Sequence, residues 1–84
     1  MKTAAAIAEL SARLAAAAAD RDELRIHRNK VSRAYTASEE RGEPDAELAR
    51  AWRRYVIAQE CLELAVAAVA DLRRELDYAL SEES

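Results

Sequence analysis

The sequence predicts an all-α protein, an antiparallel two-helix hairpin that resembles a coiled coil, and three observations lead to this prediction. First, Ala, Leu, Arg and Glu dominate the 84 residues, of which 35% are charged, and this composition is typical of long helices. Second, the chain holds one glycine and one proline, Gly42 and Pro44, which lie close together near its middle. Third, apolar residues recur at alternating intervals of three and four on both sides of that break, which is the heptad pattern of packed helices.

The first predicted helix runs from about residue 3 to residue 40. Thr3 supplies the hydroxyl of an N-cap residue, and neither glycine nor proline interrupts the chain before Gly42. Ten residues repeat the heptad spacing and form the predicted seam of this helix, the line that faces the other helix: Ile7, Leu10, Leu14, Ala17, Arg21, Leu24, Arg28, Val31, Tyr35 and Ser38. Because Arg21 and Arg28 lie in the seam, we expect their guanidinium groups to meet a carboxylate or an anionic partner.

The chain is expected to reverse over residues 41–44. Gly42 can take the left-handed conformation that ends a helix, and Pro44 suits the first turn of the next helix. Asp45 and Glu47 follow, where the positive end of the helix dipole favours acidic side chains. The second helix is therefore predicted from about residue 45 to residue 81, and residues 1–84 are expected to form one domain.

The second helix has its own predicted seam, in which eight of the ten residues are apolar or aromatic. Its members are Leu48, Trp52, Tyr55, Gln59, Leu62, Val66, Val69, Arg73, Leu76 and Leu80. In an antiparallel hairpin, residues of the two seams lie opposite one another when their numbers sum to roughly 83 to 90.

Beside this seam the second helix carries a further apolar line. It consists of Ile57, Cys61, Leu64, Ala68 and Leu72. Monomers seldom expose a contiguous apolar patch, so we expect these five residues to form the contact of a homodimer, with two hairpins building a four-helix bundle. The alternative is that the alanines of this stretch serve only as good helix formers.

Seven cations occupy two stretches without acids, which the hairpin brings side by side. They are Arg25, Arg28, Lys30 and Arg33 in the first helix, and Arg50, Arg53 and Arg54 in the second. Trp52 lies among them, and Trp and Arg are enriched at binding hot spots. We expect this basic end near the turn to recognise an acidic protein surface. A nucleic acid held through its phosphates, or a merely solvated face, are the alternatives.

No motif of an enzyme, a cofactor site or a metal site stands out in the sequence. His27 is expected to be a surface residue, and the single cysteine, Cys61, excludes an internal disulfide. Glu9 and Arg13 interrupt the Ala-rich start, and no apolar run approaches the roughly 18 residues of a membrane span, so we expect a cytoplasmic protein that does not enter membranes. The predicted function is a small non-enzymatic protein-binding module without cofactors: a regulator, adaptor or inhibitor of the kind that phages and mobile elements encode. The second hypothesis is a nucleic-acid-binding accessory protein; the net charge of −3 argues against it.

Overall fold

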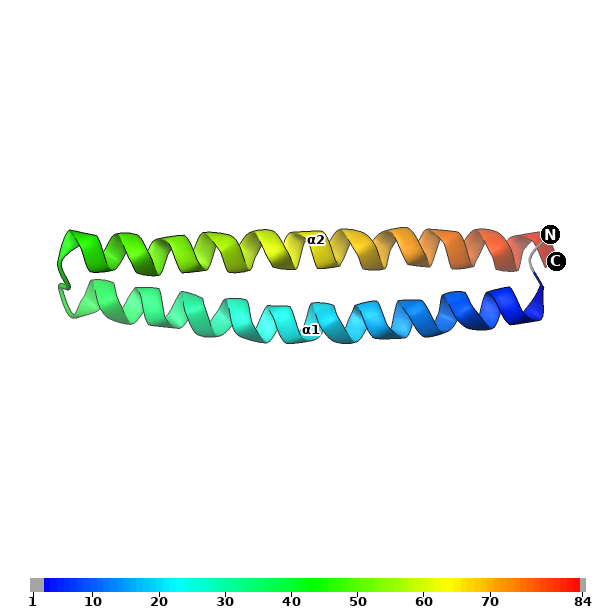
Figure 1. The fold of residues 1–84 in the computed structure, drawn as a ribbon, viewed down its shortest axis with the longest axis horizontal. Coiled ribbons are helices and arrows are strands. Elements are labelled where there is room, and N and C mark those ends of the chain that lie inside the picture. The colour runs from blue at the N-terminus through cyan, green and yellow to red at the C-terminus, as the bar shows by residue number, and fades with distance from the viewer. Residues whose placement is uncertain (1–2, 84) are drawn as a thin grey trace.

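The chain folds into an antiparallel hairpin of two long α-helices, shown by a computed structural model that describes residues 3–83 (Figure 1). α1 covers Ala4–Glu40 and α2 covers Asp45–Glu83. The hairpin is a rod with extents of 60 × 14 × 13 Å. Its radius of gyration is 18.6 Å, whereas a compact chain of this length has about 12 Å. The predicted all-α hairpin is thereby confirmed.

Local hydrogen bonds fix the ends of α1. The Thr3 Oγ1 atom accepts a hydrogen bond from the Ala6 backbone N–H at 3.1 Å, as expected of an N-cap. At the other end Gly42 has a φ of 66°, and its N–H donates to the Glu39 carbonyl while the N–H of Glu43 donates to the Ser38 carbonyl. This pair of bonds is the Schellman motif, in which a left-handed residue satisfies the last carbonyls of a helix.

The reversal ends at Pro44, as predicted, and α2 begins at Asp45. Pro44 directly precedes the first residue of the helix, and its carbonyl accepts hydrogen bonds from the N–H groups of Glu47 and Leu48. A proline has no N–H to lose at this position, so the next helix begins at once. The helices therefore start and stop close to the predicted residues.

The seam of α1 lies where the heptad pattern predicts it. All ten predicted seam residues, from Ile7 to Ser38, are buried or half-buried. Arg21 forms an ion pair with Asp22 at 3.1 Å, as expected. Arg28 meets amides instead of a carboxylate: its Nη1 donates to Gln59 Oε1 at 2.7 Å and its Nε donates to Asn29 Oδ1 at 2.8 Å.

Four of the ten predicted α2 seam residues are wrong by one position, whereas Gln59 is half-buried and contacts Arg28 as a seam residue should. Leu48, Tyr55, Leu62, Val69 and Leu76 face α1 as predicted, since all five are buried or half-buried. The intervening positions belong to Ala51, Ala58, Ala65, Leu72 and Ala79, which are buried or half-buried as well. Four of the residues predicted there lie on the exposed edge of the seam instead: Trp52, Val66, Arg73 and Leu80.

The physical reason is the fit of large side chains against small ones. Residues whose numbers sum to about 87 lie opposite each other, as the Arg28–Gln59 hydrogen bond and the Tyr35–Trp52 ring contact show. The long Arg28 and Tyr35 side chains of α1 therefore reach α2 beside Ala58 and Ala51. Small residues at these positions leave room for the long ones. The prediction had placed the larger residues of the neighbouring positions in the seam.

The core of the hairpin is thin. The buried apolar residues among those described are Leu10, Ala58, Leu62, Val69 and Ala79. The accessible surface is 6011 Å², whereas a compact monomer of 9.3 kDa exposes about 5,000 Å². The rod thus leaves more surface in water than a compact fold of its mass would. Within the described residues, neither helix combines the length and apolar character needed to cross a membrane.

Candidate protein-binding surfaces

The seven cations form a band around the rod, which we call the basic band. Lys30 and Arg54 line one groove between the helices. Arg33 and Arg53 lie half a heptad from the seams of their helices, so they point outward in opposite directions. The band therefore surrounds the rod instead of forming one flat patch, and any partner meets only part of it.

Three members of the basic band have partners within the chain. Arg28 donates to Gln59 and Asn29, Arg25 lies 3.7 Å from the Asp22 carboxylate, and Arg50 pairs with Glu47. The other four make no ion pair within residues 3–83: Lys30, Arg33, Arg53 and Arg54. These four exposed side chains are the cations that remain for a partner.

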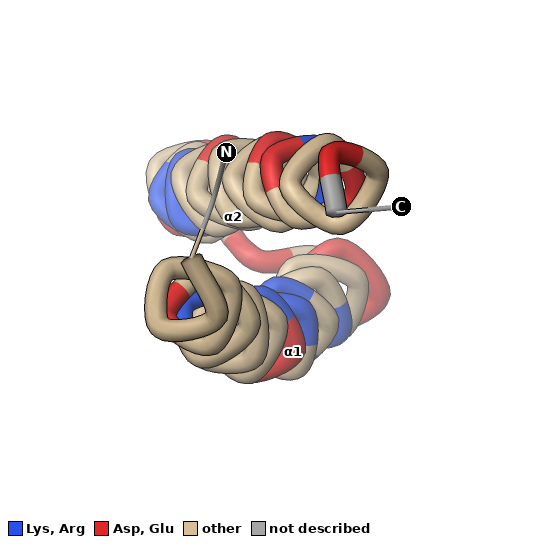
Figure 2. Tube along the Cα trace, turned by 90° about the vertical axis from the view of Figure 1, so that its right-hand side faces the viewer, with Lys and Arg blue, Asp and Glu red and all other residues tan. Residues whose placement is uncertain are grey.

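Acidic zones flank the basic band on both sides. The turn, residues 39–47, carries five acids and one arginine, and acidic segments are visible at the connection between the helices in Figure 2. Beyond the band, residues 1–23 and 60–84 carry eleven acids and five cations. The expectation of a basic end near the turn thus needs correction, since the tip itself is acidic. The charge along the rod alternates from negative to positive to negative.

An aromatic cluster lies on one side of the basic band. The Trp52 ring is 5.3 Å from the Tyr35 ring and 5.4 Å from the Tyr55 ring, between ring centroids. These three residues and Ser32 line a shallow hollow of about 240 Å³. Trp52 is 50% exposed, so it neither fills the seam nor stands free of it. Tilted ring contacts at this spacing are favourable and fix the orientation of the indole.

The Tyr35 hydroxyl at this site is held in its neutral form. Partial burial raises the pKa of Tyr35, and the negative charge and hydrogen bond of Glu39 raise it further. At the turn, hydrogen bonds from Arg41 and Ser38 lower the pKa of Glu43, with the charge of Arg41 acting in the same direction. Neither shift places a titration near neutral pH, so both groups keep one charge state there.

A second surface lies on the opposite side of α2, where the predicted dimer contact maps. Leu64 is 73% exposed and Ile57 is 55% exposed, and Cys61 and Ala68 are exposed beside them. Leu72 is half-buried in the seam and faces α1, so the structure separates it from the other four. We call Ile57, Cys61, Leu64 and Ala68 the apolar face.

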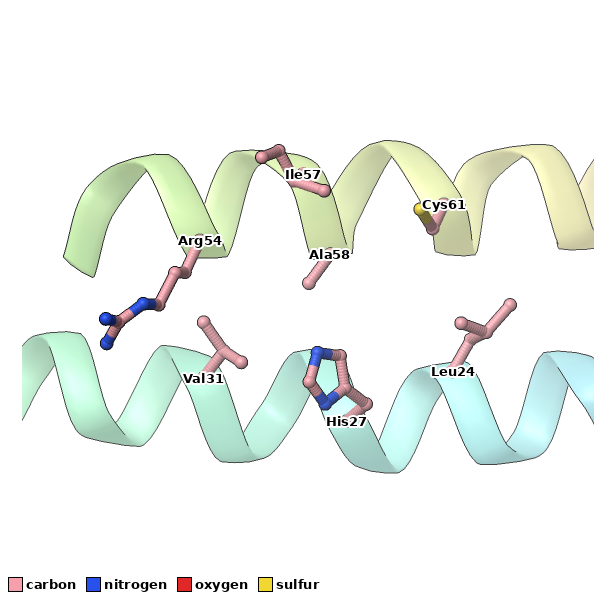
Figure 3. A pocket seen from close by; sticks show the side chains of 7 residues that line it. All are labelled: Leu24, His27, Val31, Arg54, Ile57, Ala58 and Cys61. Carbon is pink, nitrogen blue, oxygen red and sulfur yellow. The ribbon is translucent and has the colours of Figure 1, made fainter. Parts of the chain in front are cut away.

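The apolar face continues into a groove between the helices (Figure 3). The groove has a volume of about 410 Å³. Its lining, drawn in Figure 3, consists of Leu24, His27, Val31, Arg54, Ile57, Ala58 and Cys61. His27 was expected only as a surface residue, and the antiparallel register now places it at a groove. The heptad position of His27 beside the seam is the signal that could have revealed this.

Sequence reasoning also missed three large apolar side chains in water. Ile26 is 68% exposed, Tyr78 is 67% exposed and Val66 is 44% exposed. Tyr78 lies on the same side of α2 as the apolar face, because seven residues separate it from Asp71 and another seven separate Asp71 from Leu64. It therefore extends that side toward the end of the rod.

Comparisons with models of protein families, with curated proteins and with solved structures found no match to this chain. Within the described residues, no three His, Cys, Asp or Glu side chains come together as a set that could hold a metal ion. The hairpin therefore offers two candidate binding surfaces: the basic band with its aromatic cluster, and the apolar face.

Proposed function

We propose that the chain is a non-enzymatic protein-binding module that works as a homodimer and recognises an acidic segment of a partner protein. The basic band and the aromatic cluster supply the recognition surface, and the apolar face of α2 supplies the contact between two hairpins in a four-helix bundle. One observation carries the proposal: two tyrosines hold a half-exposed tryptophan in place, and the next residue, Arg53, is a cation without an ion pair among the described residues.

Trp52 has the properties of a binding anchor. Tryptophan supplies a large contact area, and hot spots at interfaces are enriched in Trp, Tyr and Arg. Because Tyr35 and Tyr55 already orient the Trp52 ring, little side-chain freedom is lost when a partner covers it. Arg53 follows Trp52 directly and has no ion pair among the described residues, so its charge is available to a partner carboxylate.

The charge pattern favours a protein segment over a nucleic acid. The basic band is about 22 Å long in α1, at roughly 1.5 Å for each of its residues 24–38. A nucleic acid that follows the rod beyond this length meets acids at the turn and in the distal half. Affinity for nucleic acid depends on the number of phosphates neutralised, which stays small on a band of this width. A docked acidic segment needs only one side of the band.

A capture experiment tests the proposal. The tagged wild-type protein and three variants are exposed to extract from the native host after nuclease treatment, and the captured proteins are identified by mass spectrometry. Trp52→Ala and Arg53→Glu should each lose at least nine-tenths of the specifically captured protein. Arg13→Glu is the matched control, because Arg13 is an exposed cation without an ion pair among the described residues, outside the band.

The identified protein is then purified and its affinity is measured. The proposal requires tight binding to wild type and Arg13→Glu, an acidic binding segment, and binding that weakens with salt. Equal binding by Arg53→Glu and Trp52→Ala would contradict it. Capture that occurs from untreated extract but not from nuclease-treated extract, together with salt-sensitive binding to plain DNA or RNA, would support a nucleic-acid accessory function in its place.

A further inference from the structure

We infer that the two copies of the homodimer pair antiparallel along α2, with residues opposite one another when their numbers sum to about 125. This arrangement deepens the proposed function and rests on its homodimer. It names the occupant of the apolar face as the same face of a second copy.

A second heptad seam on α2 carries the inference. Ten positions at alternating intervals of three and four share the side on which the apolar face lies: Glu47, Arg50, Arg54, Ile57, Cys61, Leu64, Ala68, Asp71, Glu75 and Tyr78. All ten are exposed in the hairpin. The line is apolar at its centre, with Arg50 and Arg54 on the side of the turn and Asp71 and Glu75 on the side of the termini; Glu47 and Tyr78 lie at its two ends. A stripe of this kind is self-complementary only when the second copy runs in the opposite direction.

Apolar layers form the centre of the antiparallel pair. In the usual layer pattern of antiparallel coiled coils, Cys61 lies opposite Leu64 of the second copy, and Ile57 lies opposite Ala68 of the second copy. The two-fold axis makes each layer occur twice. Leu64 and Ile57, now 73% and 55% exposed, would lose most of their contact with water. Each large residue again meets a smaller one, as in the seam within the hairpin.

Oppositely charged layers flank this centre. Arg54 lies opposite Asp71 of the second copy, and Arg50 lies opposite Glu75 of the second copy. Arg54 has no ion pair within the described chain, so this contact gives it one. Beyond these two charged layers, Glu47 lies opposite Tyr78 of the second copy. This contact covers part of the exposed Tyr78 ring.

A parallel pair lacks this complementarity. In a parallel pair in register, Arg54 would lie beside Arg54, Asp71 beside Asp71 and Glu75 beside Glu75. Like charges at opposed positions destabilise a helical interface, and opposite charges there set the orientation. The antiparallel pair also places the basic band of each hairpin beside the acidic distal half of the other.

The surface available agrees with the need of a stable dimer. The hairpin exposes about 1,000 Å² more than a compact monomer of its mass, and standard protein interfaces bury about 800 Å² on each partner. The pairing covers the side of α2 that borders the groove of Leu24 and His27. Trp52 lies across the seam from that side, so the aromatic cluster stays open in the dimer, whereas Arg50 and Arg54 of the basic band take part in the dimer contact.

A substitution at the centre tests the interface. Wild type should sediment as a dimer at micromolar concentration, and Leu64→Glu should weaken the dimer at least a hundredfold. Ala70→Glu is the matched control, because Ala70 is exposed six residues away and points away from both seams. It should remain a dimer. A monomeric wild type, or Leu64→Glu that stays as dimeric as Ala70→Glu, would overturn the inference.

A charge exchange tests the register without altering the apolar centre. Arg54→Glu should weaken the dimer about tenfold, since it replaces two attractive contacts with repulsive ones. The double variant Arg54→Glu with Asp71→Arg should restore most of the affinity, because the two positions face each other across the interface. Arg33→Glu should leave the mass unchanged, since Arg33 lies on the outer side of α1. Lack of rescue by the double variant would overturn the register.

Spin labels test the direction of the pair. In a Cys61→Ala background that remains dimeric, single cysteines at Ala49 and Ala70 place labels on the side of α2 that points away from both seams. The antiparallel register separates the two labels at Ala49 by about 40 Å along the rod, and those at Ala70 by about 22 Å. Equal short distances at both positions would show a parallel pair and overturn the inference. The proposed recognition of an acidic partner is tested separately. Trp52→Ala should lose the partner but remain a dimer, and Leu64→Glu should lose the dimer but keep Trp52 exposed to the partner.

Discussion

At the scale of single residues, the alanines of α2 determine how closely the helices approach. Ala58 is 3% exposed and lies beside Gln59, to which the half-buried Arg28 donates a hydrogen bond across the seam. Ala58→Leu adds volume where the side chain of Arg28 crosses, so we expect a loss of about 1–3 kcal/mol in unfolding free energy. Urea unfolding followed by circular dichroism measures this loss. Ala67→Leu, at an exposed position of the same helix, should change the stability by less than about 0.5 kcal/mol. Equal stability of both variants would contradict the alanine seam.

The hydroxyl of Tyr35 gives a second prediction at this scale. Its pKa is raised, first by partial burial and then by Glu39, so the phenolate is disfavoured in the folded state. Its contribution to the free energy of unfolding is therefore complete at pH values below the pKa that Tyr35 has in the unfolded chain. This contribution is lost as the pH rises through the pKa that Tyr35 has in the folded protein. In a Tyr55→Phe/Tyr78→Phe variant, titration of the phenolate absorbance should therefore give a midpoint above that of a free tyrosine. Adding Glu39→Gln should lower the midpoint. An unchanged midpoint would show that Glu39 has no influence.

At the scale of the elements, one residue joins the helices. Gly42 has a φ of 66°, and no atom lies within 4 Å of the position that a Cβ would occupy. Space is therefore available, and the cost of a side chain is conformational. Gly42→Ala should lower the unfolding free energy by about 1 kcal/mol, and Gly42→Asn should cost less because asparagine tolerates the left-handed region better. Thermal unfolding of both variants measures the difference. An Ala variant as stable as wild type would contradict this reading of the Schellman motif.

The elements also show what sequence reasoning could reach. The helix ends were predictable because Thr3, Gly42 and Pro44 act through local backbone chemistry. The α1 seam was predictable because its large side chains repeat without ambiguity. The α2 seam was not, since apolar residues occupy more than one of its sides and only the fit against Arg28 and Tyr35 selects the alanines. Which cations already have partners also depends on side-chain packing, which no spacing in the sequence reveals.

At the scale of the whole molecule, the rod joins a thin core to a large exposed surface. Five apolar residues are buried among those described, and the charge alternates along the length of the rod. A chain of this length gains limited stability from its own core, so association is the available source of additional burial. In the dimer that we propose, the apolar centre of the second α2 seam would supply the energy of association, and its charged flanks would set the direction.

If folding and association are coupled in this way, the unfolding temperature depends on protein concentration. Anything that binds only the folded state stabilises it by mass action, and here that ligand is the second copy. A tenfold increase in concentration should raise the unfolding midpoint of wild type by about 4 °C, since it adds about 1.4 kcal/mol to a dimer of this size. Differential scanning fluorimetry of the Trp52 emission over a hundredfold concentration range measures this slope. Leu64→Glu should unfold at one temperature throughout, whereas Ala70→Glu should retain the slope. A flat wild-type response would show that each hairpin unfolds alone, and the exposed apolar face would then contribute nothing to the stability of the fold.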